Sequence, residues 1–198
     1  MNEFDISVLW ANVRGRLSDF RFYHSQCVAD CAKTLAARYG WDEEKAYIAG
    51  AAHDILKEQP RKSALAYFEE NGVILTPVER ACPKLWHAMA GEIYLRQTYA
   101  LPEDILLAVR YHTTGRENMT LPEKILFIAD FISADRDYPG VDEMRLRAEV
   151  SLESAMEEGL RFTIEDLAKN CKPIHPDTVA AYNQVLVGNQ KSEMKNEK

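Results

Sequence analysis

The stretch Ile-Leu-Phe-Ile-Ala-Asp-Phe-Ile at positions 125–132 decides how this chain folds. It is apolar on nearly every side, so we expect it to lie inside the protein. Thr120 and Glu123 precede it in the order of a capping box, with Pro122 in the first turn, which predicts a helix. Its one charged residue, Asp130, would then be a buried carboxylate, which is costly unless a cation meets it. Two histidines and a second aspartate elsewhere in the chain suggest that this cation is a metal ion.

Helix signals recur along the rest of the chain, and strand patterns are nearly absent. Ser18 is placed to cap a helix that Gly40 ends, and Asp42 is placed to cap the next, which we expect to run to about Glu58. Further helices are expected at 63–71, 85–99, 102–112, 141–169 with a break near 150, and 176 to about 186. We predict an all-α fold, a single globular bundle of about nine helices, because the apolar stripes are too short and irregular for a coiled coil.

The bulk composition is that of one soluble globular domain. The chain has 198 residues, 46% hydrophobic and 28% charged, and we expect a helical domain over 1–187 with a polar, disordered tail over 188–198. The net charge of −7 weighs against nucleic acid or a membrane as the main partner, since both attract basic surfaces. Without a recognisable signal segment, the four cysteines are typical of reduced thiols, and we expect a cytoplasmic protein.

Histidine and aspartate residues on other predicted helices can meet Asp130 through a shared metal ion. His53 and Asp54 are neighbours, about 100° apart on a helix, so both can reach one point beside it. His24 lies in the preceding helix, and antiparallel packing through a short connection would bring it to the same point. Two imidazoles and two carboxylates suit Fe, Mn or Zn, whereas Mg alone would prefer fewer nitrogens. The sequence therefore predicts a buried transition-metal site.

Two more histidines extend this set. If His87 and His112 converge on Asp54, this carboxylate could bridge to a second metal about 3.5–4 Å from the first, and two such metals can hold a hydroxide and clamp a phosphoryl group. The opposing interpretation is structural, since a lone helical histidine is more often a core or surface residue. A further alternative is a zinc site formed by His24, Cys27 and Cys31. The chain offers no second pair of ligands with the spacing of a zinc site, which weighs against it.

Basic and hydroxyl residues fall close to the expected metal ligands. Lys57 follows Asp54 by three positions and Arg21 precedes His24 by three, so each shares a helical face with a candidate ligand. Guanidinium forks, hydroxyls and backbone N–H groups are what phosphate oxygens require. For Lys57 the alternative role is that of a partner for the helix dipole. The predicted substrate-binding set is Arg21, Lys57, Thr113, Thr114, Gly115, Arg116 and Arg136.

The order histidine, His-Asp, aspartate across helices resembles the HD-domain superfamily of metal-dependent phosphohydrolases. Short sequence segments around these residues are more specific, and they resemble the YqeK family within that superfamily over about residues 15–185. The Tyr-His-Thr-Thr-Gly-Arg segment at 111–116 is much more specific than the His-Asp pair. The segments that carry the likeness are 35–40, 49–57, 108–116, 123–130, 139–141 and 174–178.

The resemblance implies an all-α fold, a metal centre of the iron type, and symmetric cleavage of diadenosine tetraphosphate to two ADP. It also implies that Lys57, the 113–116 segment and Arg136 lie near the nucleotide phosphates. One departure is visible, because the family usually has Glu-Pro where this chain has Ser133 and Ala134. By position, the metal site would consist of His24, His53, Asp54, His87, His112 and Asp130.

We therefore predict a metal-dependent pyrophosphohydrolase. Asp54 or Asp130 would orient the attacking water, and Lys57 and Arg116, with Arg136 as a further candidate, would stabilise the transition state electrostatically. We expect one or two ions, Fe first and Mn or Zn as alternatives, and a small nucleotide as the partner.

Other functions stay open at this point. One alternative is an HD-type phosphatase or phosphodiesterase that acts on other nucleotides. Another is a module that binds nucleotides without catalysis, or a helical module whose histidines are structural. The oligomeric state is also open, with a homodimer through apolar helices as one option.

Overall fold

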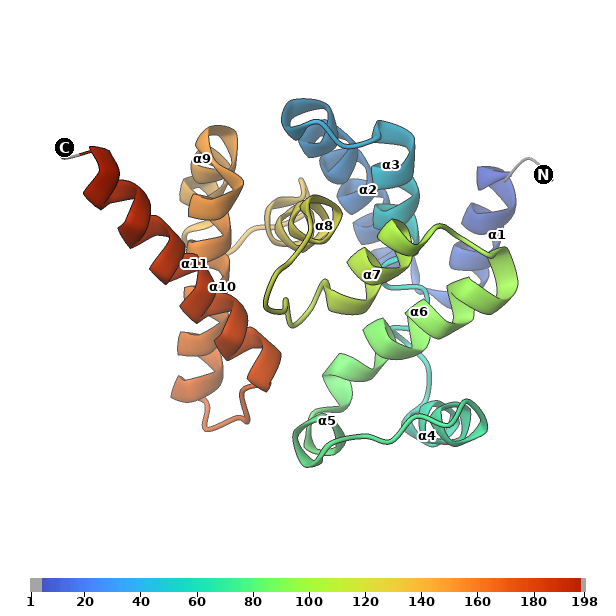
Figure 1. Cartoon of the computed structure of the whole chain (residues 1–198). Helices are drawn as coiled ribbons and strands as arrows, with labels where there is room; N and C mark the ends of the chain where they lie inside the picture. The colour runs from blue at the N-terminus through green and yellow to red at the C-terminus, as the bar shows by residue number, and fades with distance from the viewer. Residues whose placement is uncertain (1–4, 197–198) are drawn as a thin grey trace.

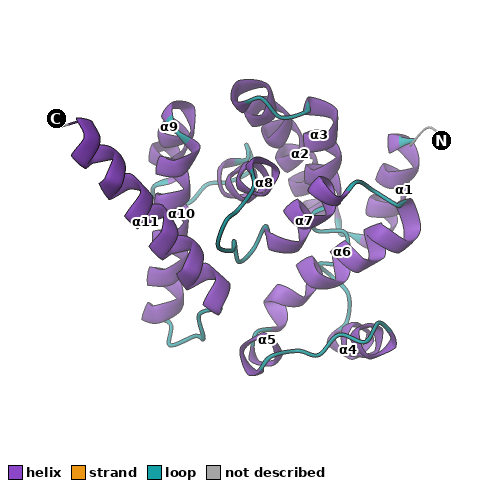
Figure 2. Cartoon of the chain, viewed as in Figure 1, coloured by secondary structure: helices purple, strands orange, loops and turns teal. Residues whose placement is uncertain are grey.

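A computed structural model of the chain describes the backbone of residues 5–196 and the side chains of residues 5–188 (Figure 1). This part contains eleven α-helices and one short 3₁₀ helix, and no strand occurs among the described residues (Figure 2). The predicted all-α fold is confirmed, with somewhat more helices than expected. No described helix combines the length and the apolar character that crossing a bilayer requires.

The first half of the chain contains α1 (Ile6–Arg16), α2 (Asp19–Tyr39), α3 (Glu43–Ala52), α4 (Arg61–Glu70), α5 (Pro77–Ala81) and the 3₁₀ helix η1 (Pro83–Leu85). The second half contains α6 (Trp86–Tyr99), α7 (Glu103–Tyr111), α8 (Leu121–Ile132), α9 (Val141–Val150), α10 (Leu152–Lys169) and α11 (Pro176–Asn196). The expected break near 150 separates α9 from α10. The helix α1 was not anticipated, and α11 continues past its expected end near residue 186. The tail over 188–198 stays a prediction, and its last two residues lie outside the described part.

The helix α8 is the buried centre that its apolar stretch predicts. Ile125, Leu126, Ile128 and Ala129 have no exposure to solvent. Its capping box forms as expected, with Thr120 and Glu123 bonded reciprocally. Figure 1 shows α8 between α2, α3 and α7 on one side and α9, α10 and α11 on the other, and it packs on α2, α3, α7, α9 and α10. Residues on its surface therefore face several other helices at once.

The helices α2 and α3 are packed unusually close. Gly40, at φ 86°, ends α2 in the left-handed conformation that glycine adopts readily, and the chain turns back into α3. A Cβ on Gly50 would lie 2.5 Å from the Cα of Ala29, so only glycine allows this approach. The close packing brings the C-terminal end of α3 beside the first half of α2, where His24 lies.

The expected continuation of the α3 helix to Glu58 is wrong. The helix ends at Ala52, and the following residues form consecutive turns. The backbone N–H groups of Ile55 and Lys57 bond to carbonyls three residues earlier, at 3.1 and 2.8 Å, which tightens the chain beyond α-helical geometry. The buried His53 and Asp54 begin this tight segment.

Candidate metal centre

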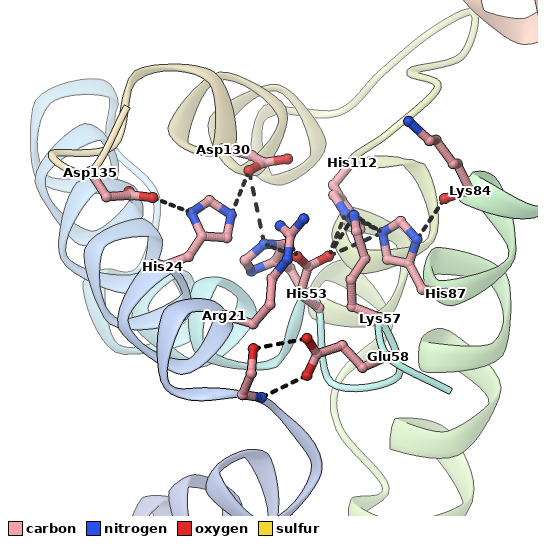
Figure 3. A network of polar contacts seen from close by, with 12 residues as sticks. Arg21, His24, His53, Lys57, Glu58, Lys84, His87, His112, Asp130 and Asp135 are labelled. Atoms are coloured by element: carbon pink, nitrogen blue, oxygen red, sulfur yellow. Dashed lines mark hydrogen bonds and ion pairs between the residues drawn. The ribbon is translucent and has the colours of Figure 1, made fainter. Parts of the chain in front are cut away.

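All six side chains predicted as metal ligands meet in the interior of the bundle. His24 comes from α2, His53 and Asp54 follow α3, His87 comes from α6, His112 follows α7 and Asp130 comes from α8. The four histidines and Asp54 are at most 5% exposed. In Figure 3, His24 and Asp130 lie on one side and His112, His87 and Lys57 on the other, with His53 between them. We call these six residues the ligand cluster.

One half of the ligand cluster is formed by His24, His53 and Asp130. The Oδ1 atom of Asp130 lies 3.0 Å from Nε2 of His24 and 3.9 Å from Nε2 of His53. One ligand atom from each of the three residues falls within 4.8 Å of the other two. Two imidazole nitrogens and a carboxylate at such distances can hold one transition-metal ion.

The other half is formed around Asp54. Its Oδ1 lies 3.1 Å from Nε2 of His87 and 3.7 Å from Nε2 of His112, while its Oδ2 lies 3.6 Å from Nε2 of His53. The two oxygens of one carboxylate thus face different histidines. This is the bridging position that the sequence predicts for Asp54 in a site with two metals.

Backbone carbonyls orient three of the four imidazole rings. Nδ1 of His53, His87 and His112 each lies 2.7 Å from the carbonyl oxygen of the residue three positions earlier. A carbonyl only accepts hydrogen bonds, so Nδ1 carries the proton and Nε2 presents its lone pair to the cluster. In His24 the carboxylate of Asp135 contacts Nδ1 at 2.8 Å instead. Metal-binding histidines are held in the same manner, through the nitrogen that does not face the metal.

The protonation states of His53, His87 and Asp54 suit metal binding. Burial lowers the pKa of His53 to about 3 and that of His87 to about 4, so both rings are neutral near pH 7. Burial by itself would raise the pKa of Asp54, but the surrounding His53, His112 and His87 hold it well below the ordinary value. Neutral imidazoles and an ionised carboxylate are the forms in which these groups bind metals.

One atom of the cluster is left without a partner. Nε2 of His53 is buried and has no hydrogen-bond partner among the described residues. Buried nitrogen atoms of this kind are normally satisfied, since an unpaired polar group in the interior is costly. A metal ion between His53 and the two carboxylates would satisfy it, so the residues present fit such an ion.

Asp130 is met by a cation of the chain itself. Arg136 donates from Nη2 to Oδ1 of Asp130 and from Nε to the backbone oxygen of Asp130, the latter at 2.7 Å. The side chain of Asp130 is also 18% exposed, more than the surrounding apolar stretch predicts. The burial of this carboxylate therefore does not by itself require a metal. The convergence of four Nε2 atoms is the stronger indication.

Asp135 belongs to the site and was missed by the sequence reasoning. Its Oδ2 contacts His24, and its Oδ1 accepts a hydrogen bond of 2.7 Å from the hydroxyl of Ser133. It lies in the polar segment after α8, where nothing in the local pattern separates it from Asp137. Only the return of this segment toward α2 brings it to the ring of His24.

Three of the predicted phosphate-binding cations lie directly at the cluster, Lys57, Arg21 and Arg136. Lys57 donates to Oδ1 of Asp54 at 3.2 Å, and its Nζ is 3.0 Å from Nε2 of His87. Arg21 donates from Nη1 to Oδ2 of Asp54 at 3.4 Å. With Arg136 near His24, three cationic side chains therefore surround the ligand cluster on a protein that is acidic overall.

The residues of the 113–116 segment differ in where their side chains lie, some near the ligand cluster and others within the loop itself. The hydroxyl of Thr113 is buried without a hydrogen-bond partner and borders a cavity that also touches Lys57 and His87. Thr114 is buried and bonds through its hydroxyl to the carbonyl of Gly115 at 2.9 Å. Thr113 thus borders a cavity near the cluster, whereas Thr114 and Gly115 shape the loop.

Arg116 contacts the scaffold rather than the ligand cluster. Its Nε and Nη2 bond to Oε1 of the fully buried Glu123 at 2.9 and 2.8 Å, and its guanidinium lies 4.7 Å from the ring centre of Tyr111. No contact within the described residues joins Arg116 to the ligand cluster. Its contacts are those of a residue that positions the loop, and the catalytic role expected from sequence stays a prediction.

The alternative zinc site is not formed. The groups of candidate ligand atoms in the described part of the chain contain no cysteine. Both ring nitrogens of His24 face carboxylates, Asp130 and Asp135, instead of Cys27 or Cys31.

Comparison with known proteins agrees with this geometry. The family model of the HD domain matches residues 21–135. A crystal structure from Clostridium acetobutylicum, described as a predicted HD superfamily hydrolase involved in NAD metabolism, superposes with a TM-score of 0.90 at 33% identity and covers 94% of this chain and 99% of that one. The chain therefore belongs to the HD-domain family, a family of phosphohydrolases.

Within that family the chain is similar to proteins named bis(5'-nucleosyl)-tetraphosphatase, symmetrical. The relative from Bacillus subtilis (strain 168) is 37% identical, over 90% of this chain and 96% of the relative. The relative from Halalkalibacterium halodurans is 38% identical, over 88% of this chain and 94% of the relative. The resemblance inferred from the sequence motifs is confirmed.

Proposed function

We propose that this protein is a metal-dependent hydrolase that cleaves bis(5'-nucleosyl) tetraphosphates symmetrically, diadenosine tetraphosphate giving two ADP. The observation that carries the proposal is the position of Asp54, whose two oxygens face three imidazole Nε2 atoms and two cations. The activity named for relatives that align over about nine-tenths of the chain supports the choice of substrate.

The two halves of the ligand cluster would each hold one ion. His24, His53 and Asp130 fit the first, and Asp54 with His112 and His87 fits the second. A bound Fe, which we propose ahead of Mn or Zn, would supply a Lewis acid and a hydroxide source near neutral pH. Because the four cysteines are free thiols, we also propose that the protein works in the cytoplasm.

The chain's own residues would stabilise charge and orient the water. Lys57, Arg21 and Arg136 surround the ligand cluster, so anhydride oxygens placed there would meet fixed positive charge, which is the main source of rate in phosphoryl transfer. Burial alone would raise the pKa of Asp130, but the hydrogen bond with His24 and the nearby His53 and Arg136 hold it well below its ordinary value. It is therefore ionised near neutral pH and can accept a hydrogen bond from the attacking water.

Turnover of diadenosine tetraphosphate by the purified protein with Mn or Fe tests this function. We expect ADP as the only nucleotide product, separated by anion-exchange chromatography. ATP and AMP in equal amounts would contradict symmetric cleavage. An absence of turnover with every divalent metal tried would contradict the enzyme itself.

A further inference from the structure

A cavity of about 450 Å³ opens directly beside the ligand cluster. Lys57, His87 and Thr113 border it on the side of the cluster. Its walls come from two parts of the chain, the 81–85 segment that spans the end of α5 and η1, and the end of α10 with the following link, which face each other in Figure 1. Cys82 and Pro173 connect these walls, with Sγ of Cys82 3.9 Å from the carbonyl oxygen of Pro173. We call this space the arm cavity.

The charge around the arm cavity is one-sided. Four cationic side chains border it, from Lys57, Arg61, Lys84 and Lys172, and no carboxylate does. Arg61, Lys84 and Lys172 make no side-chain hydrogen bond or ion pair within the described residues. On a chain with a net charge of −7, such a gathering of unpaired cations favours an anionic ligand.

The remaining lining of the arm cavity is mainly apolar. Leu85 and Leu167 supply aliphatic surface, and Pro83 and Pro173 add rigid rings. Thr113, Thr163, His175 and Thr178 add polar side chains to the lining. Small-molecule sites commonly combine such apolar walls with a few polar groups that fix orientation. An inorganic phosphate chain would gain nothing from the apolar part, whereas a nucleoside would.

Building on the proposed function, we infer that the arm cavity holds one nucleoside diphosphate arm of the substrate. The phosphates would lie near Lys57 and Lys84, and the nucleoside would pack against Leu85 and Leu167. Arg61 and Lys172 would stand at the cavity's border and attract the anion. Symmetric cleavage would then have a structural cause, because two phosphates would lie between the nucleoside in the cavity and the bond over the ligand cluster.

The substitution Leu167→Trp tests the apolar part, because it fills space beside a half-buried wall without touching the ligand cluster. We expect the Kd for ADP, measured by calorimetry on metal-loaded protein, to rise about tenfold or more, and the Kd for pyrophosphate to stay within about twofold. Leu146→Trp, on an exposed position of α9, is the matched control and should change neither value. An unchanged Kd for ADP in Leu167→Trp would overturn the inference.

Charge reversal tests the cationic part. Arg61→Glu borders the arm cavity, whereas Lys62→Glu is its exposed neighbour on α4 and does not. We expect the first variant to weaken ADP binding about tenfold and the second less than about twofold. Lys172→Glu and Lys169→Glu form a second pair with the same expectation. Equal losses of ADP affinity within both pairs would mean that only the net charge of the protein matters. That result would overturn the placement of the nucleoside diphosphate in the arm cavity.

Diadenosine pentaphosphate tests the length of the arm. Hydrolysis of this substrate by the wild-type protein should give ADP and ATP in equal amounts, because two phosphates remain on the arm in the cavity and three on the other product. AMP with adenosine tetraphosphate would overturn the inference. If the wild type fails to hydrolyse diadenosine tetraphosphate at all, the proposed function fails, while the ADP affinities of the variants still decide on the cavity.

Discussion

At the residue scale, the site depends on which nitrogen of each histidine is exposed to the cluster. Three carbonyls and one carboxylate occupy the Nδ1 side, so the Nε2 lone pairs converge without rearrangement. Much of the site is therefore set before any ion arrives. The consequences of removing a ligand differ from those of removing a group that orients one.

Asp130→Ala should lower the metal content of the purified protein about tenfold or more, together with its activity. The variant loses a ligand oxygen and leaves the guanidinium of Arg136 without its carboxylate. Elemental analysis of metal per protein, with circular dichroism to confirm the fold, provides the measurement. Asp137→Ala, an exposed neighbour, is the control and should retain its metal. Full metal content in Asp130→Ala would exclude this carboxylate as a ligand.

Asp135→Asn should have a graded effect. The side chain touches Nδ1 of His24 and orients the ring without facing the cluster, and groups of this kind are worth about 10–100-fold in metal affinity or activity. Metal titration of the chelator-treated protein should therefore show weaker but measurable binding. An affinity equal to that of the wild type would remove Asp135 from the site.

At the element scale, the close approach of α2 and α3 places His24 and His53 together. Both helices present alanines to each other, and the contact at Gly50 leaves no room for a Cβ. The carbonyl of Gly50 also accepts the hydrogen bond that orients His53. Gly50 therefore determines both the close packing of α2 on α3 and the orientation of the His53 ring.

Gly50→Ala should destabilise the protein by about 1–3 kcal/mol, as overpacking in a core does, and should also lower metal content. The new methyl group meets backbone atoms of Ala29, so the two helices must separate and His53 must move. Thermal unfolding and elemental analysis measure the two effects. Gly15→Ala is the matched control, because a Cβ there meets nothing within 4 Å and should be neutral or stabilise helix α1 by about 1 kcal/mol. Equal stability of the two variants would contradict the close contact.

The capping box of α5 predicts a dependence of stability on pH. Burial by itself would raise the pKa of Glu79, but hydrogen bonds with Thr76 and the charges of Arg110 and His175 lower it below 4.5. The carboxylate therefore stabilises the fold above pH 4.5, and this contribution is lost as the pH falls through the lowered pKa. Glu79→Gln should cost about 1 kcal/mol at neutral pH and much less at about pH 3.

Thermal unfolding of the Glu79→Gln variant and the wild type across this pH range measures the difference. Glu69→Gln, on an exposed position of α4, should show no such dependence and serves as the control. A loss of stability that stays constant down to about pH 3 would show that the negative charge of Glu79 does not matter.

At the scale of the whole molecule, the ligand cluster joins five helical segments from both halves of the chain. A ligand that binds only the folded state stabilises it, by about 2.7 kcal/mol when its free concentration is a hundred times Kd. Metal binding should therefore raise the melting temperature by about 5–10 °C for a chain of this size. Treatment with a chelator should reverse the shift, and Asp130→Ala should reduce it. An identical melting temperature with and without metal would contradict a site that spans these helices.

The sequence carried most of the secondary structure and the chemical identity of the site. Capping residues such as Asp42 and Thr120 act through neighbours a few positions away, so their helix starts could be read from the chain. Ser18 also precedes its helix as expected, although its hydroxyl bonds to Glu58 instead of its own first turn. The apolar character of 125–132 required burial wherever that helix lay. The six ligand candidates were identified by residue type, order and resemblance, and all six meet.

What the chain alone could not decide depends on contacts between distant segments. The helix α3 ends at Ala52, immediately before the buried His53, and Asp135 joins the site because the segment after α8 returns to α2. Arg116 faces Glu123 and Tyr111, although its position beside His112 in the sequence suggested the cluster. The arm cavity likewise exists only between α5, η1 and α10. Local patterns determine helices because their hydrogen bonds are local, whereas the direction of a side chain and the shape of a cavity are set by whatever packs against them.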